Sequence, residues 1–226
     1  MPDLKSLQLD LTDWTLDQEE AEAAIWIDKE TDILALNLFN AQPDIPAPCN
    51  GVEGLRNHFR QLAHAHGSGI VEVDVVHIHN LACGRLIIKT PQTPSGCSYR
   101  GTILIPRENF SFVIRVQCLE HGVTGGKEVL VMMVEDSNLT IESVGEEYCE
   151  HPIFGRVLKT GEMRGWVKDP YDPQFDNIAL FNLADHPKYD AQFPDHPLSR
   201  VRRKLTHIIN TVHLGRDILD AAEFSN

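Results

Sequence analysis

The chain has 226 residues, with 33 acidic and 20 basic side chains and a formal net charge of −13. Hydrophobic residues make up 42% and charged residues 23%, a mixture typical of a globular protein rather than a disordered one. The acidic balance argues against general nucleic-acid binding, because phosphates would be repelled. No apolar run approaches the roughly 20 residues that span a bilayer, and no basic-then-apolar leader opens the chain.

The acidic excess is concentrated in two blocks, residues 10–32 and 136–150. The second block holds five acids and no base. One interpretation is solvated surface, and the alternative is an acidic face that attracts a basic protein partner. The residues that would form this partner-binding face are Asp136, Glu142, Glu146 and Glu147.

The first predicted elements are two strands, 24–27 and 33–39, joined by a polar hairpin turn. Prolines then break the chain before a predicted helix over 52–66, whose apolar residues recur at helical spacing. Asn50 is the expected N-cap of this helix, and Glu53 follows at the spacing of a capping box.

The middle of the chain is rich in strand patterns. Five further strands are predicted, at 70–79, 85–89, 98–105, 110–119 and 129–134. Their connections are too short for parallel crossovers, so the sheet of about seven strands is expected to be antiparallel. On the strand 110–119, Ser111, Arg115 and Gln117 share one face with Val113.

The C-terminal part is expected to be a loop-rich cover over 136–195, followed by an amphipathic helix over 197–215. The basic side of this helix is expected to be solvated or to pair with residues 136–150. Its members are Arg200, Arg202, Arg203 and Lys204. Helices flanking one antiparallel sheet predict a single α+β domain over 1–226, with its core at 24–134.

One histidine pair suggests metal chemistry. Side chains at i and i+2 of a strand point to the same face, so His77 and His79 could both bind one zinc ion. The alternative is a solvent-facing pair without a ligand, and no other cofactor is indicated. Five cysteines without a CxxC pair indicate neither a disulfide framework nor a zinc knuckle, and reduced cysteines favour the cytoplasm.

The order of hairpin, capped helix, strand meander and C-terminal helix resembles the MOG1/PsbP-like α+β sandwiches. The resemblance covers residues 24–134, and it includes the helix Val52 to His66, the run Arg100-Gly101-Thr102-Ile103-Leu104-Ile105-Pro106 and the strand that starts at Phe110. It implies a small binding module of bacterial type, in a group whose members often have no known activity.

The sequence contains no catalytic motif that decides a reaction. The first functional prediction is therefore a cytoplasmic, non-enzymatic protein-binding module, inhibitor-like or immunity-like, with a basic protein partner. Two alternatives stay open. One is a metal-dependent hydrolase that uses His77 and His79, and the other is a small-molecule binder with a pocket between the sheet and residues 136–195.

Overall fold

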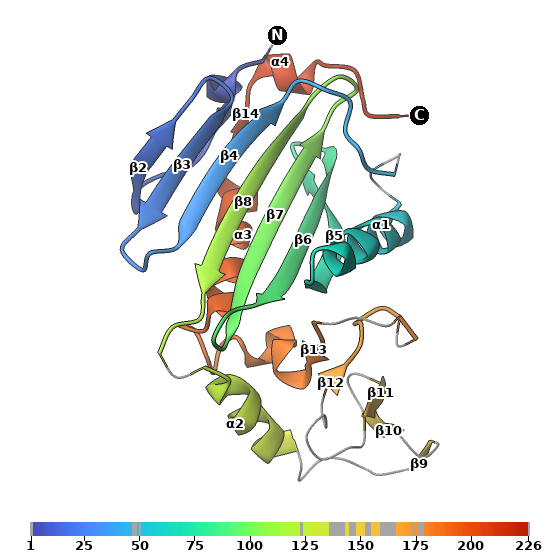
Figure 1. Cartoon of the computed structure of the whole chain (residues 1–226). Helices are drawn as coiled ribbons and strands as arrows, with labels where there is room; N and C mark the ends of the chain where they lie inside the picture. The colour runs from blue at the N-terminus through green and yellow to red at the C-terminus, as the bar shows by residue number, and fades with distance from the viewer. Residues whose placement is uncertain are drawn as a thin grey trace.

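The computed structural model describes residues 2–46, 49, 51–122, 124–135, 143–144, 148–151, 155–158, 166–172, 174–175 and 179–225. The fold is α+β, as predicted: an antiparallel sheet carries helices on both faces (Figure 1). Within the described chain, no helix is long and apolar enough to cross a membrane.

The main sheet has seven strands, and every neighbouring pair is antiparallel. In spatial order they are β2 (Trp14–Glu19), β3 (Ala23–Asp28), β4 (Ile33–Phe39), β8 (Ser111–Leu119), β7 (Cys97–Pro106), β6 (Leu81–Pro91) and β5 (Gly69–Ile78). The chain leaves β4 in the middle of the sheet and returns at the far edge as β5. The helix α1 (Val52–Ala65) lies in that connection and crosses one face of the sheet.

The predicted number of strands is confirmed, but their membership differs at two places. The edge strand β2 was not predicted, since most of its side chains are exposed and it lacks an apolar alternation. The predicted strand 129–134 is wrong, because these residues belong to the helix α2 (Gly126–Glu135). Lys127 and Val131 are buried four residues apart whereas Val129 and Leu130 are exposed, which is the period of a helix.

The helix α3 (Pro197–Thr211) packs along the sheet behind β7 and β8 in Figure 1. Its predicted apolar stripe is buried, with Val201, Leu205 and Ile208 in one cluster with sheet residues such as Ile103 and Ile114. Pro197 opens the helix as predicted. The helix ends at Thr211 rather than at residue 215, because the chain becomes extended and β14 (His213–Leu214) pairs with β1 (Leu7–Gln8).

The helix α1 packs on the opposite face, against the edge formed by β5 and β6 (Figure 1). Leu55, Phe59 and Ala63 are buried at spacings of four residues, as the predicted helix requires. The N-cap is Gly51, without a side-chain cap, and the predicted cap Asn50 lies outside the described residues.

The described part of the predicted cover contains short paired strands and turns of 3-10 helix. They are β9 (Ser143–Val144), β10 (Tyr148–His151), β11 (Gly155–Leu158), β12 (Trp166–Val167), β13 (Phe181–Asn182), η2 (Leu183–Asp185) and η3 (Pro187–Tyr189). Two further short helices lie near the ends of the chain, η1 (Leu4–Ser6) and α4 (Arg216–Leu219). Asp169 forms an ion pair with Arg60 of α1 at 3.1 Å, and the backbone N–H of Val73 on β5 donates to the hydroxyl of Tyr171. This segment therefore packs beside α1 and the edge of the sheet.

Candidate functional site

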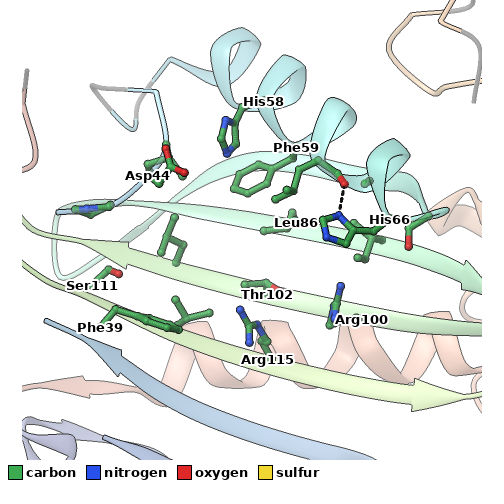
Figure 2. A pocket seen from close by; sticks show the side chains of 18 of the residues that line it. Phe39, Asp44, His58, Phe59, His66, Leu86, Arg100, Thr102, Ser111 and Arg115 are labelled. Atoms are coloured by element: carbon green, nitrogen blue, oxygen red, sulfur yellow. Dashed lines mark hydrogen bonds between the residues drawn. The ribbon is translucent and has the colours of Figure 1, made fainter. Parts of the chain in front are cut away.

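A cavity of about 600 Å³ lies between α1 and the sheet face on which α1 packs (Figure 2). Its volume falls in the range of roughly 300–1,000 Å³ that is usual for small-molecule sites. The sequence also suggested a small-molecule pocket, but between the sheet and residues 136–195. The structure places this cavity beside α1 instead, because α1 covers only the β5–β6 side of its face.

The wall of the cavity is largely apolar. The helix contributes Phe59, Leu62 and Ala63, and the strands contribute Leu86, Ile88, Leu104 and Val113. At the rim, Phe39 is 45% exposed and Leu62 is 48% exposed. An apolar ligand in the cavity would remove these two side chains from water, which favours binding by about 25 cal/mol for each Å² covered.

Two arginines form the cationic part of the wall (Figure 2). Arg100 on β7 and Arg115 on β8 lie on the same face, and the residue paired with Arg115 is Thr102, two positions from Arg100. They are therefore diagonal neighbours across one ladder. Neither guanidinium has a hydrogen bond or an ion pair with any residue that the structure describes. Both side chains are exposed to solvent. The protein around Arg115 removes part of its hydration and lowers its pKa, and the positive charge of Arg100 lowers it further.

Three further titratable side chains line the wall. The Nδ1 atom of His66 lies 2.8 Å from the carbonyl oxygen of Leu62, to which it donates (Figure 2). His58 projects from α1, and Asp44 projects from the loop after β4. Figure 2 shows Asp44 well separated from the two arginines, so the charges at the two ends of the cavity have opposite sign.

The sequence contained one signal for this site. It placed Arg115 on the face of Val113, and an arginine that shares a sheet face with apolar residues is a candidate ligand contact. The strand pattern predicted no function for this face, and it placed Arg100 in a strand without giving it a role. The cavity was missed because its other wall is α1, whose docking position does not follow from local sequence patterns.

A second cluster lies where β8, α2 and the start of α3 meet, next to a cavity of about 410 Å³. Glu120, Glu128 and His196 bring ligand-type atoms within 4.8 Å of one another. Both carboxylate oxygens of Glu120 accept backbone N–H groups, from Cys97 at 3.0 Å and from Gly125 at 2.8 Å.

The tautomer of His196 argues against a metal ion in this cluster. Its Nδ1 accepts the backbone N–H of Leu198 at 3.2 Å, as the N-cap of α3. The neutral ring therefore carries its proton on Nε2, a buried atom without a hydrogen-bond partner among the described residues. Coordination through Nε2 would require that proton to leave while Nδ1 keeps its role as the N-cap acceptor, so the cluster is a poor metal site.

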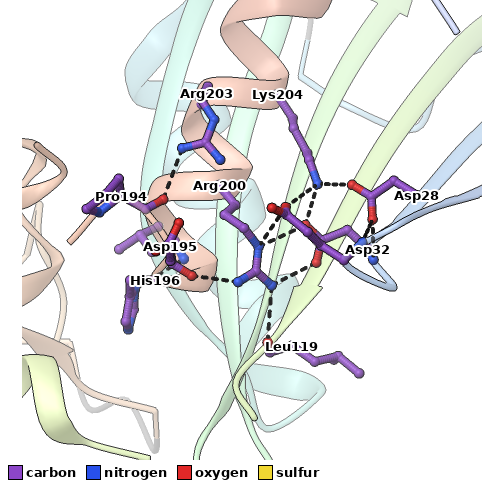
Figure 3. Close-up of polar contacts among 11 residues, drawn as sticks. Asp28, Asp32, Leu119, Pro194, Asp195, His196, Arg200, Arg203 and Lys204 are labelled. Atoms are coloured by element: carbon purple, nitrogen blue, oxygen red, sulfur yellow. Dashed lines mark hydrogen bonds and ion pairs between the residues drawn. The ribbon is translucent and has the colours of Figure 1, made fainter. Parts of the chain in front are cut away.

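A third cluster joins the β3–β4 turn to α3 (Figure 3). Arg200 donates to Asp32 at 2.8 and 2.9 Å, and Lys204 donates to Asp28 at 2.5 Å and also to Asp32. Burial disfavours ionisation of Asp32, but the hydrogen bonds from Arg200 and Lys204 outweigh it and lower its pKa. Glu30 is also within ion-pair range of both cations, so three carboxylates share two cations of α3.

These contacts also correct the expectation for the basic side of the C-terminal helix. Arg200 and Lys204 are only partly solvated, and their partners belong to the N-terminal acidic block rather than to residues 136–150. Arg202 pairs with Glu72 at 2.5 Å and with Asp190 at 2.8 Å. Part of the N-terminal acidity therefore fastens α3 to the sheet.

The geometric basis of the predicted zinc pair is not met. The strand β5 ends at Ile78, with His77 exposed on it. His79 and Asn80 have φ of +48° and +69° and form the two-residue turn into β6, so the rule that i and i+2 share a face does not apply. The Nε2 atom of His79 lies 3.2 Å from the carbonyl oxygen of Val212.

The predicted partner-binding residues Asp136, Glu142, Glu146 and Glu147 lie outside the described residues. An acidic docking face for a basic protein therefore stays a prediction.

No protein-family model and no curated protein sequence matches the chain. Three solved structures show partial likeness. A Bacteroides thetaiotaomicron chain is 10% identical with a TM-score of 0.34, and the match covers 52% of this chain and 40% of that one. A Pseudomonas aeruginosa protein of unknown function is 12% identical with a TM-score of 0.33, and the match covers 59% of this chain and 99% of that one.

The third structure is LpqN, involved in cell envelope biogenesis of Mycobacterium tuberculosis. It is 13% identical with a TM-score of 0.29, and the match covers 58% of this chain and 78% of LpqN. The match spans less than half the length of the Bacteroides protein. Likeness at this level carries no functional argument, and the resemblance to the MOG1/PsbP-like sandwiches stays a prediction.

Proposed function

We propose that the protein binds a small molecule in the cavity between α1 and the sheet. The observation that carries the proposal is a cavity of small-molecule size whose apolar walls come from two elements and whose rim leaves large apolar side chains in water.

The site supports binding more directly than catalysis. Its titratable members are a pair of arginines, two histidines and a carboxylate at the far end. No hydrogen bond between a hydroxyl and a histidine is found among the cavity residues that the structure describes, so no nucleophile with an adjacent base is present in that part of the chain. The arrangement orients a ligand by charge at one end and holds it by apolar contact.

The test uses the uncharged fluorophore N-phenyl-1-naphthylamine, whose emission rises when it leaves water. We expect saturable binding to the wild-type protein. The substitution Thr102→Trp places an indole on the floor of the cavity and should weaken binding by about tenfold or more, since apolar volume is lost. The matched control is Thr15→Trp, on the exposed edge strand β2 outside the cavity.

The proposal fails if the wild-type protein shows no saturable fluorescence. It also fails if Thr15→Trp and Thr102→Trp weaken binding equally while both variants retain the wild-type melting temperature.

A further inference from the structure

Among the described strands of the main sheet, Arg100 and Arg115 differ from the other cations in having no ion pair. Cations elsewhere on this sheet are paired, such as Arg85 with Glu72 and Lys89 with Asp185, each at 2.5 Å. Arg100 and Arg115 stand side by side in a protein of net charge −13, without an acidic neighbour in hydrogen-bond range. Two like charges at diagonal positions of a ladder repel, so the free protein holds them at a cost.

An anionic group removes that cost. A guanidinium presents its N–H donors in a planar fork that fits a carboxylate, sulfonate or phosphate, and two neighbouring forks can share one such group. Both arginines are exposed in the free protein, so an anion can reach them, and an apolar ligand body that excludes water beside them would strengthen the attraction.

The apolar part of the cavity lies next to this cationic end. Val113 precedes Arg115 by two residues on the same strand face, a separation of about 7 Å, and Leu104 follows Thr102 in the same way on β7. If the acidic group of a ligand binds the arginines, the adjoining apolar part of the ligand therefore contacts Val113 and Leu104 and is covered by α1.

The far end of the cavity restricts the charge of the ligand. Asp44 lines that end and has no ion-pair partner among the described residues, so a second anionic group there would be repelled. A ligand with one acidic end and one uncharged end fits both ends of the cavity.

We infer that the ligand is an amphipathic anion with a single acidic group, held by Arg100 and Arg115, and an apolar body packed against α1 and the sheet. This inference rests on the proposed function, since it specifies what the same cavity binds.

The experiment compares two probes that differ by one anionic group. 1-Anilinonaphthalene-8-sulfonate has the ring system of N-phenyl-1-naphthylamine plus a sulfonate. We expect the wild-type protein to bind the sulfonate about tenfold more tightly at low salt, and this preference should shrink as salt is added. Arg100→Gln/Arg115→Gln should abolish the preference, so that the variant binds the two probes with similar affinity.

The control variant removes two positive charges outside the cavity. Arg203→Gln/Arg216→Gln changes exposed residues of α3 and α4, and it should keep the preference for the sulfonate. Competition then identifies the acidic group: decanoate or decyl phosphate should displace the bound sulfonate probe at lower concentration than 1-decanol.

Three results overturn the inference: equal affinity of the wild-type protein for both probes, equal loss in the two arginine double variants, or equal displacement by 1-decanol and the two anions. In each case the uncharged probe still binds. Failure of the proposed function has a different signature, because the uncharged probe then does not bind either.

Discussion

At the scale of single residues, His196 links helix capping to ionisation. Its side chain is the N-cap of α3, where Nδ1 accepts the N–H of Leu198. Burial lowers the pKa of His196 to about 3, and the nearby positive charge of Lys127 contributes to the same shift. The ring therefore stays neutral in the folded protein at a pH where a histidine of the unfolded chain is already protonated.

This difference predicts a stability change on acidification. Between pH 6.5 and about 3 the unfolded chain binds a proton at this residue and the folded protein does not, so the free energy of unfolding falls as pH falls. By pH 5 the contribution is about 2 kcal/mol. Chemical denaturation measures the free energy of unfolding at pH 7 and at pH 5. The decrease between the two should be smaller for His196→Asn than for the wild-type protein, because asparagine caps the helix without titrating. Equal losses in the two proteins would contradict the prediction.

At the scale of elements, the contact between α3 and β7 depends on the absence of a side chain at Gly101. A Cβ built on Gly101 would lie 2.6 Å from Leu205 Cδ1 and 2.6 Å from Val201 Cγ1. The helix therefore rests directly on the backbone of the sheet, and the two surfaces can move apart only by losing contacts along the whole stripe.

We expect Gly101→Ala to lower the free energy of unfolding by about 1–3 kcal/mol, through overpacking between helix and strand. Adding Leu205→Ala should cost less in this background than in the wild-type protein, because it removes one of the clashing groups. Gly84→Ala is the matched control on β6, since its Cβ would meet only Leu104 Cβ, at 3.7 Å. Urea denaturation measures all four variants, and additive effects of Gly101→Ala and Leu205→Ala would count against this contact.

At the scale of the whole molecule, the sheet separates two apolar cores of unequal extent. The core under α3 includes residues of β4, β6, β7 and β8 and is reinforced by the ion pairs of Arg200 and Lys204. The core under α1 is smaller and adjoins the open cavity. The helix α1 should therefore open more readily than the rest of the fold.

Amide hydrogen exchange tests this difference. We expect Leu55 and Phe59 in α1 to exchange faster than Ile103 and Ile114 in the central strands, because local opening of α1 exposes less apolar surface. Saturation with 1-anilinonaphthalene-8-sulfonate should slow exchange in α1 selectively. Exchange of α1 at the rate of the central strands would show that the two faces open as one unit.

The elements that were predicted correctly have strong local patterns. The hairpin of β3 and β4, the helix α1 and the stripe of α3 each repeat apolar residues at a defined period. The helix α2 was mistaken for a strand because its run Val129–Val134 is apolar at every position and has no period of its own. It contacts η2, about fifty residues away in the sequence, and a local pattern carries no information about such a contact.

The candidate site was less accessible to sequence reasoning. The alternation on β8 placed Arg115 correctly, but the ladder that brings Arg100 beside it and the docking of α1 both depend on tertiary structure. The His77–His79 pair shows the opposite case, since its pattern was clear but the strand ended one residue too early. A spacing argument holds only while the element that it assumes continues.

The position of α3 in the chain affects how the protein is made. The strands β2 to β8 are complete by Leu119, but the helix that covers their α3-side face begins only at Pro197. At about 5–20 residues per second, the ribosome needs roughly 4–16 s to add the intervening residues. During that interval Ile103, Ile114 and Val116 of the nascent chain have no helix over them. A chaperone that shields this face would act before α3 emerges, and a transcript truncated ahead of residue 197 would yield a chain that exposes it permanently.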